Sequence, residues 1–155
     1  MKKLNLILVS FLSTIYFLNF NFSFSAELSL ISGKAIIIDV DTIKIKGETI
    51  RFGGIDTPEK KQIGHVFSKI KLKNKIKNKV ITCVRERDKD RWGRTIAECF
   101  IKDQSISSFM VKNGYACDYV KYSNKKFAKE QLHAKSKKLG IWKMNFDTSW
   151  EKKCG

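Results

Sequence analysis

The sequence has a single proline and lacks a proline-rich linker, an internal repeat or a low-complexity tail. Nothing in it therefore marks a boundary between two domains, and its 155 residues suit one domain. About 130 residues remain if a leader is removed, and a chain of that length can still bury about two-thirds of its unfolded surface in a core.

Histidines are also scarce, and the cysteines do not occur at zinc-binding spacings. His65 and His133 stand alone, and no C-x-x-C or H-x-x-x-H motif is present, which argues against a zinc site. The four cysteines are an even set, as expected for disulfides in an exported protein: Cys83, Cys99, Cys117 and Cys154. Four cysteines allow three pairings. Cys83 and Cys99 fall on predicted neighbouring strands, which favours a bridge between them and leaves Cys117 for Cys154.

Acidic residues number 15 against 31 lysines and arginines, so the formal net charge is +16. A positive field of this size attracts polyanions and accelerates their encounter with the protein. Nucleic acid is the first candidate partner, and an anionic membrane surface or an acidic glycan is the alternative. Charge alone does not choose between them.

The first 25 residues have the composition of a secretory signal peptide. Lys2 and Lys3 precede a largely apolar stretch from Leu4 to Phe22, and Ser23 and Ser25 provide small residues before a cut at Ala26. An uncleaved membrane anchor is the alternative, because the stretch is nearly long enough to span a bilayer. We expect residues 1–25 to be removed and residues 26–155 to form an exported domain, periplasmic or secreted.

Alternating and β-branched segments predict five short strands. They cover Lys34–Asp39, Thr42–Lys46, Thr49–Phe52, Lys79–Arg87 and Arg94–Ile101, with Gly47-Glu48 as a turn. Helical periodicity predicts three helices: His65–Asn78, a second that contains Ile106, Phe109 and Met110 and stops at Gly114, and a third from a Ser123 cap to about Lys138, with Gly140 at its end. This order fits a mainly β, α+β protein with a closed five-stranded Greek-key barrel, the OB-fold.

Charged residues gather near the predicted strand ends between Asp39 and Arg94. Asp39 and Asp41 have the spacing of side chains on one face of a strand, and Arg51 ends the next strand pair. Asp56-Thr57-Pro58-Glu59 follows, in a loop that Pro58 makes rigid. Phosphodiester hydrolysis requires positive charge on the phosphoryl oxygens, a positioned water and, where a metal takes part, oxygen ligands. Arginine, glutamate and aspartate supply these groups in turn.

Three blocks of the sequence resemble the signatures of the thermonuclease family, typified by staphylococcal nuclease. They are Asp41-Thr42, Arg51 followed by Ile55-Asp56-Thr57-Pro58-Glu59, and Arg91-Trp92-Gly93-Arg94. The similarity continues through Gly114-Tyr115-Ala116, Lys121-Tyr122-Ser123 and Gly140-Ile141-Trp142, and so covers nearly the whole chain after the leader.

The resemblance implies a calcium-dependent endonuclease that hydrolyses DNA and/or RNA and leaves 3′-phosphate ends. Asp41, Asp56 and the carbonyl of Thr57 would bind Ca²⁺. Glu59 would act as general base or orient the water, and Arg51 and Arg94 would bind the phosphate. The implied substrate contacts are Arg91, Trp92 and Tyr122. Nucleic acid is the expected partner, with no stable protein partner, a monomeric state, and membrane contact only through an uncleaved leader.

One departure from the family pattern concerns Val40, which stands where a glycine is usual before the metal-ligating aspartate. If that glycine serves a positive φ, Val40 would displace Asp41 and weaken calcium binding. If the residue is extended, valine is harmless, and we favour this interpretation. A non-catalytic OB-fold that only binds nucleic acid is the alternative function.

Overall fold

The computed structural model describes residues 29–87, 89–144 and 153–154. The predicted signal peptide, residues 1–25, lies outside this range. Among the described residues, no helix has both the length and the apolar character needed to cross a bilayer.

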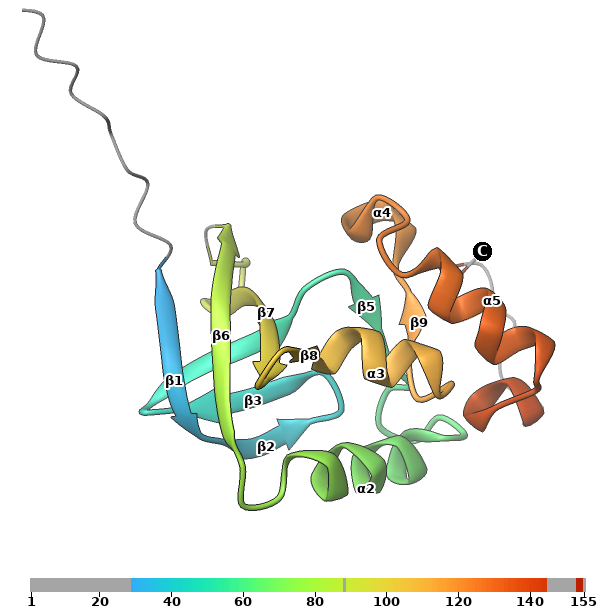
Figure 1. The fold of residues 1–155 in the computed structure, drawn as a ribbon, viewed down its shortest axis with the longest axis horizontal. Coiled ribbons are helices and arrows are strands. Elements are labelled where there is room, and N and C mark those ends of the chain that lie inside the picture. Colours follow the sequence, from blue (N-terminus) through green and yellow to red (C-terminus); the bar gives the residue numbers. More distant parts are fainter. Residues whose placement is uncertain (1–28, 88, 145–152, 155) are drawn as a thin grey trace, which may run out of the picture.

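The main sheet closes into a barrel because its two ends belong to one bent strand (Figure 1). Its path runs β1-β6-β7-β4-β3-β2, and only Ala35 separates β1 from β2. The strands are β1 Leu30–Lys34, β2 Ile36–Asp39, β3 Thr42–Ile45, β4 Glu48–Phe52, β6 Val80–Arg87 and β7 Thr95–Ile101. Counting β1 and β2 as one, five strands form the barrel, with β4 and β7 parallel and the other pairs antiparallel. This confirms the predicted fold class.

Alternate residues of these strands point inward and form the core. Ile43 and Ile45 of β3 and Ile50 and Phe52 of β4 are completely buried. The disulfide Cys83–Cys99 belongs to the same core and joins directly paired residues of β6 and β7, with their Cα atoms 4.0 Å apart. The strand-based expectation for this bridge is therefore confirmed.

Helices cover one end of the barrel and build a lobe beside it (Figure 1). They are α2 His65–Ile76, α3 Ile106–Lys112, α4 Val120–Ser123, α5 Ala128–Ser136 and the 3-10 helix η2 Gly140–Lys143. Two short pairs complete the structure: β8 Gln104–Ser105 extends β7, and β5 Ile55–Asp56 pairs with β9 Cys117–Asp118. The β5–β9 pair lies between the barrel and the lobe, and Cys117 forms the second disulfide with Cys154.

The turn after β3 was predicted one residue too late. Lys46 and Gly47 occupy it, with φ of 49° and 86°, and Glu48 already pairs with Ile45. Two positive φ values are typical of the two-residue turns that join antiparallel strands. Lysine at the first turn position hides this signal, because such a φ is unfavourable for a side chain with a Cβ.

The last helix was predicted with the wrong start. Ser123 is the final residue of α4, and Asn124 and Lys125 follow with φ of 52° and 64°. The Ser123 hydroxyl accepts a hydrogen bond from the Lys125 amide in this turn, and α5 starts only at Ala128. Gly140 likewise begins η2 instead of ending α5. Ser123 is thus a turn residue, which is the other common use of serine next to a helix.

Candidate active site

Residues from six segments, most of them polar, line one cleft with a volume of about 1030 Å³. Its walls include all five side chains to which the sequence assigned chemistry: Asp41, Arg51, Asp56, Glu59 and Arg94. Arg91, Trp92 and Tyr122, the predicted substrate contacts, line it as well. Thr57 is buried and does not belong to the lining, as is natural for a residue expected to act through its backbone carbonyl.

The barrel places Asp41 and Arg51 opposite each other. Asp41 lies in the turn between β2 and β3, next to an irregularity in their register, and its carbonyl accepts a hydrogen bond from the Phe52 amide (2.8 Å). Arg51 is the direct partner of Thr42 in the β3–β4 pair. The Thr42 hydroxyl donates to Asp41 Oδ1 (2.7 Å), which orients the carboxylate.

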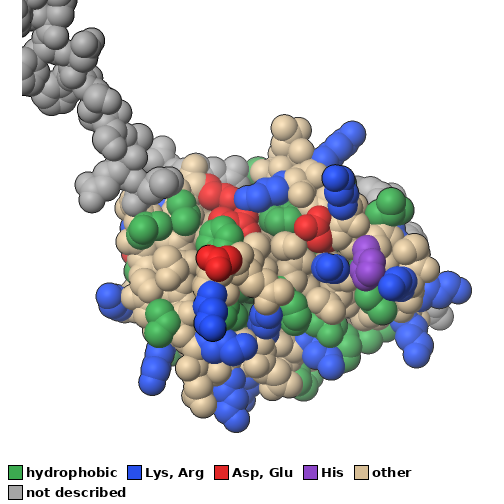
Figure 2. All heavy atoms as spheres, in the orientation of Figure 1, with side chains coloured by type: hydrophobic (Ala, Val, Ile, Leu, Met, Phe, Trp, Pro, Cys, Tyr) green, Lys and Arg blue, Asp and Glu red, His purple; other side chains and the backbone are tan. Residues whose placement is uncertain are grey.

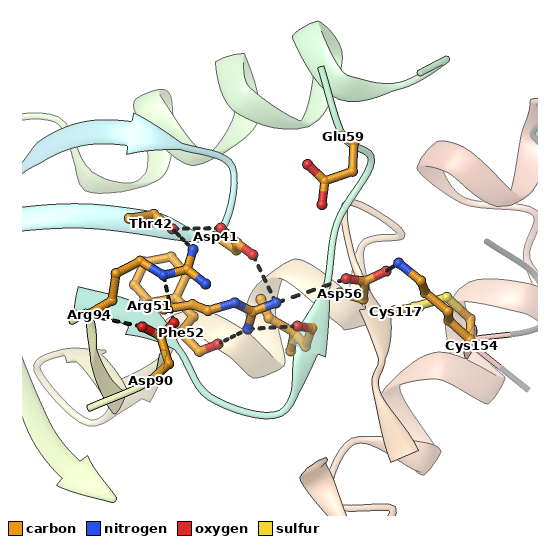
Figure 3. A network of polar contacts seen from close by, with 12 residues as sticks. Asp41, Thr42, Arg51, Phe52, Asp56, Glu59, Asp90, Arg94, Cys117 and Cys154 are labelled. Carbon is orange, nitrogen blue, oxygen red and sulfur yellow. Dashed lines mark hydrogen bonds and ion pairs between the residues drawn. A yellow bond between two sulfur atoms is a disulfide. The ribbon is translucent and has the colours of Figure 1, made fainter. Parts of the chain in front are cut away.

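Arg51 holds the centre of the polar network (Figure 3). Its Nη2 is 3.1 Å from Asp41 Oδ2 and 3.9 Å from Asp56 Oδ1. Its Nη1 donates to the carbonyls of Phe52 (3.0 Å) and Ile55 (3.3 Å). A guanidinium group with this many partners is fixed in position, and it places positive charge between two carboxylates.

Asp56 is the buried member of the carboxylate pair. Its position on β5 is set by the pairing with Cys117, and its Oδ2 has no hydrogen-bond partner. Burial raises the pKa of Asp56 above its ordinary value, and the neighbouring Asp41 charge acts in the same direction, whereas Lys153 and Arg51 act to lower it. A buried carboxylate oxygen without a hydrogen bond, next to a second carboxylate, is a suitable ligand set for a hard divalent cation such as Ca²⁺.

Two cysteines lie close to Asp56 but do not form a metal site with it. The sulfur atoms of Cys117 and Cys154 lie within 4.8 Å of an Asp56 oxygen, but they are joined in a disulfide. Thiolate ligands to a metal require free cysteines, and the described residues contain none.

Arg94 is positioned by Asp90, a residue to which the sequence assigned no role. Asp90 Oδ2 accepts from Arg94 Nε (2.7 Å), and its Oδ1 accepts from the amides of Trp92 (3.0 Å) and Arg94 (2.9 Å). Burial alone would raise the pKa of Asp90, but the hydrogen bonds from the backbone and side chain of Arg94 hold it below its ordinary value. One carboxylate thus shapes the turn and orients the arginine that follows it.

Two arginine guanidinium groups lie over the indole ring of Trp92. The Cζ atoms of Arg91 and Arg94 lie 4.0 and 4.9 Å from the Trp92 ring, at distances where cation–π attraction operates. The indole is 64% exposed at the mouth of the cleft. Tyr122 also lines the cleft and lies edge-on to Tyr119, with their ring centroids 4.8 Å apart.

Glu59 projects from the loop after β5 toward the space in front of Asp41 and Arg51 (Figure 3). Its amide donates to the Gln62 side chain (2.7 Å), which orders the loop. The residue is exposed, so its carboxylate can contact solvent and a molecule in the cleft.

Three cleft features were not found by sequence reasoning. Asp90 and Arg94 are four residues apart, a spacing that often indicates an ion pair in helices, so the sequence did contain a usable signal for this contact. Asp39 pairs with His65 at the start of α2 (2.8 Å), and this contact between distant segments left no pattern in the sequence. Lys153 lies 3.7 Å from Asp56 Oδ2 and is held there by the neighbouring Cys154 disulfide.

The fold and the cleft define the class of the protein, an OB-type barrel of five strands with arginines and carboxylates in one cleft. The chain belongs to the family of staphylococcal nuclease homologues, because residues 49–144 match that family. The match contains Arg51, Asp56, Glu59 and Arg94 and begins after Asp41, whose place in the cleft comes from the structure.

Curated relatives agree with this membership. The chain is 35% identical over 101 residues to an uncharacterized endonuclease of Haemophilus influenzae, covering 64% of this chain and 56% of that protein. It is 32% identical over 125 residues to the SPbeta prophage-derived endonuclease YokF of Bacillus subtilis (70% and 42%). It is 29% identical over 124 residues to the thermonuclease of Staphylococcus intermedius (73% and 72%). The chain therefore spans about half the length of the first two proteins.

Proposed function

We propose that the protein is an exported, calcium-dependent endonuclease that hydrolyses phosphodiester bonds of DNA and/or RNA and leaves 3′-phosphate ends. The observation that carries this proposal is the presence of Asp41, Arg51, Asp56, Glu59 and Arg94 on the walls of one cleft. Membership of the nuclease family and the endonucleases among the relatives support it.

Asp41, Asp56 and the carbonyl of Thr57 are the residues that would hold the cation. When bound, Ca²⁺ supplies positive charge to a phosphoryl oxygen and a coordination position for water. Arg51 then exchanges the Asp41 carboxylate for a phosphate oxygen, which its forked geometry suits. The Asp56 Oδ2 without a hydrogen bond, and the position of both carboxylates within 4 Å of Arg51 Nη2, support this assignment.

Glu59 takes the proton of the attacking water or holds that water in line with the leaving oxygen. Arg51 and Arg94 bind the phosphoryl oxygens more strongly as negative charge develops on them, and this differential binding lowers the barrier. Trp92 and Tyr122 are exposed aromatic side chains at the cleft. Bases of single strands are free to stack on such faces.

Glu59 also separates this proposal from the alternative of a barrel that only binds nucleic acid. A carboxylate at the phosphate site repels a polyanion and therefore opposes simple binding. Its exposed position in the cleft favours a role in the chemistry.

The decisive experiment measures cleavage of labelled DNA and RNA with Ca²⁺ and with a chelator, for the native protein and a Glu59→Gln variant. We expect cleavage that requires Ca²⁺, products whose 3′ ends are phosphatase-sensitive, and a loss of about 10²–10⁴-fold in rate for Glu59→Gln. Asp103→Asn, which removes an exposed carboxylate outside the cleft, is the control. Full activity of Glu59→Gln, or cleavage unaffected by the chelator, would contradict the proposal.

Export has its own test. N-terminal sequencing of the protein recovered from outside the cytoplasm should begin at Ala26. The two disulfides support export, since such bonds persist in oxidising compartments.

We also expect the protein to be a monomer. Light scattering of the purified protein should give the mass of a single chain.

A further inference from the structure

A second groove, lined by lysines, lies at the other end of β2 from the cleft. It has a volume of about 450 Å³. Its lining contains no acidic residue and five lysines: Lys34, Lys69, Lys73, Lys77 and Lys79. In Figure 2 lysine and arginine side chains are spread over the visible face, and several of them lie along its lower edge, where Figure 1 draws α2.

The lysines of α2 and Lys77, the residue that follows the helix, fall into two sets with different surroundings. Lys71 and Lys75 lie over the aromatic rings of Phe67 and Phe109. Lys69, Lys73 and Lys77 follow at intervals of four residues, so they share the face that borders the groove. Like charges at this spacing destabilise a helix, and an anion in the groove would remove that repulsion.

The groove lysines have no salt-bridge partner in the part of the chain that the structure describes. No ion pair of the described residues includes any of the five. Lysines in the last turn of a helix do interact favourably with its C-terminus, which explains Lys73 and Lys75. It does not explain the convergence of Lys34 from β1 and Lys79 from the loop before β6 on the same groove.

The groove and the cleft are connected along β2. Ile37 lines the groove, whereas Ile38 and Asp39 line the cleft. Lys69 joins the two, because it lines the groove and its Nζ donates to the Ile38 carbonyl (2.8 Å). The Asp39 carboxylate at this junction is paired with His65 (2.8 Å). A strand rises about 3.3 Å per residue, so roughly 10 Å separates the two ends of β2.

We propose that the lysine groove binds the phosphate backbone of the same polynucleotide strand whose scissile bond lies in the cleft, a few nucleotides away. The inference rests on the proposed function for the occupant of the cleft. It assigns the protein a preference for longer strands, since a short oligonucleotide fills the cleft without reaching the groove.

The test compares two triple variants that lose the same charge. Lys34→Gln/Lys73→Gln/Lys77→Gln alters the groove and keeps Lys69. Lys112→Gln/Lys129→Gln/Lys137→Gln removes three exposed lysines that line neither the groove nor the cleft. Binding of labelled oligothymidylates of about 20 and about 4 nucleotides is measured with a chelator present, so that no strand is cut. These lengths lie at or beyond the limits of the ~4–16 nucleotides that one OB-fold covers.

The groove variant should bind the long strand at least about tenfold more weakly than the native protein at low salt. The magnitude of the slope of log K against log[salt] should also fall by about 2. Each neutralised phosphate of a single strand contributes about 0.7 to this slope, and the variant lacks three lysines. Its affinity for the short strand should stay within about twofold of the native value. The inference is overturned if the control variant loses as much long-strand affinity, if both strand lengths are affected alike, or if the groove variant binds normally. Absence of calcium-dependent cleavage by the native protein would refute the proposed hydrolysis and leave these binding results interpretable.

Discussion

The ammonium group of Lys153 lies 3.7 Å from Oδ2 of Asp56, on the carboxylate oxygen that has no hydrogen bond. The other oxygen, Oδ1, faces Arg51 at 3.9 Å. Asp56 therefore stands between two cations, one from the barrel and one from the C-terminal tail. Any divalent cation that binds Asp56 must do so against both charges.

Replacing Lys153 with Gln should tighten calcium binding by about three- to tenfold. A fixed positive charge opposes a second cation nearby, and the effect is modest because the Lys153 side chain is 47% exposed and screened by solvent. Isothermal titration with Ca²⁺ measures it, with Lys143→Gln as the control for loss of an exposed lysine outside the cleft. Weaker binding by Lys153→Gln would instead show that the lysine orients Asp56 for the metal.

The two disulfides should differ in what their removal changes. Chain-entropy estimates assign about 3 kcal/mol of stability to Cys83–Cys99 and about 4 kcal/mol to Cys117–Cys154, from sequence separations of 16 and 37. Only the second holds Lys153 beside Asp56. Replacing Cys117 and Cys154 with serine should therefore lower stability and tighten calcium binding, whereas replacing Cys83 and Cys99 should lower stability alone.

Denaturant unfolding and calcium titration of both double variants check this prediction. Adding Lys153→Gln to the Cys117/Cys154 variant should give no further gain in affinity, because the released tail no longer presents the lysine. Equal calcium affinities in the two double variants would contradict the role given to the tail.

Much of the barrel and most of the cleft could be predicted from the sequence, because they depend on local patterns. Alternation and β-branched residues located the strands that carry Ile43 and Ile50, and neighbouring strands implied the Cys83–Cys99 bridge. Arg51, Asp56 and Glu59 occur close together in the chain, so the short segment that follows β4 brings them to one place.

Lys153 and Asp90 could not be found in the same way. Lys153 reaches the cleft through a disulfide to β9, and the sequence permits three pairings of the four cysteines. Asp90 acts on Arg94 through a turn whose shape depends on the positive φ of Gly93 (76°). The first contact depends on disulfide pairing and the second on the shape of a turn, and hydrophobic periodicity holds no information on either.

Replacing Asp90 with Asn should reduce the cleavage rate by about tenfold and the stability by about 1 kcal/mol, because Arg94 loses a charged acceptor for its Nε. The pKa of Asp90 is lowered in the folded protein. Ionised Asp90 therefore stabilises the native state above its ordinary pKa of 3.8, and this contribution is lost as the pH falls through the lowered value.

The stability difference between the native protein and Asp90→Asn should accordingly be constant near neutral pH and shrink in acid. Urea unfolding across that pH range measures it, and Asp103→Asn should show no comparable difference. A stability difference that stays the same in acid would show that the charge of Asp90 is not what holds the turn.

Val40 provides the last prediction, since it occupies the place of the usual family glycine. It is completely buried in the core beside Asp41 and is not among the residues with positive φ. Residue 40 lies in a turn and not in an extended strand, but its φ is not positive, so this backbone does not require glycine, and the valine side chain packs in the core. Val40→Gly should cost about 3 kcal/mol, from the cavity and the added freedom of the unfolded chain, and should not tighten calcium binding.

Thermal unfolding and calcium titration of Val40→Gly test both statements. Val80→Gly is the matched control, because Val80 is a strand residue that is 57% exposed, so its loss leaves no core cavity. A clear gain in calcium affinity for Val40→Gly would mean that the valine displaces Asp41 from the best ligand position. Equal destabilisation by the two variants would mean that the Val40 side chain contributes little to the core.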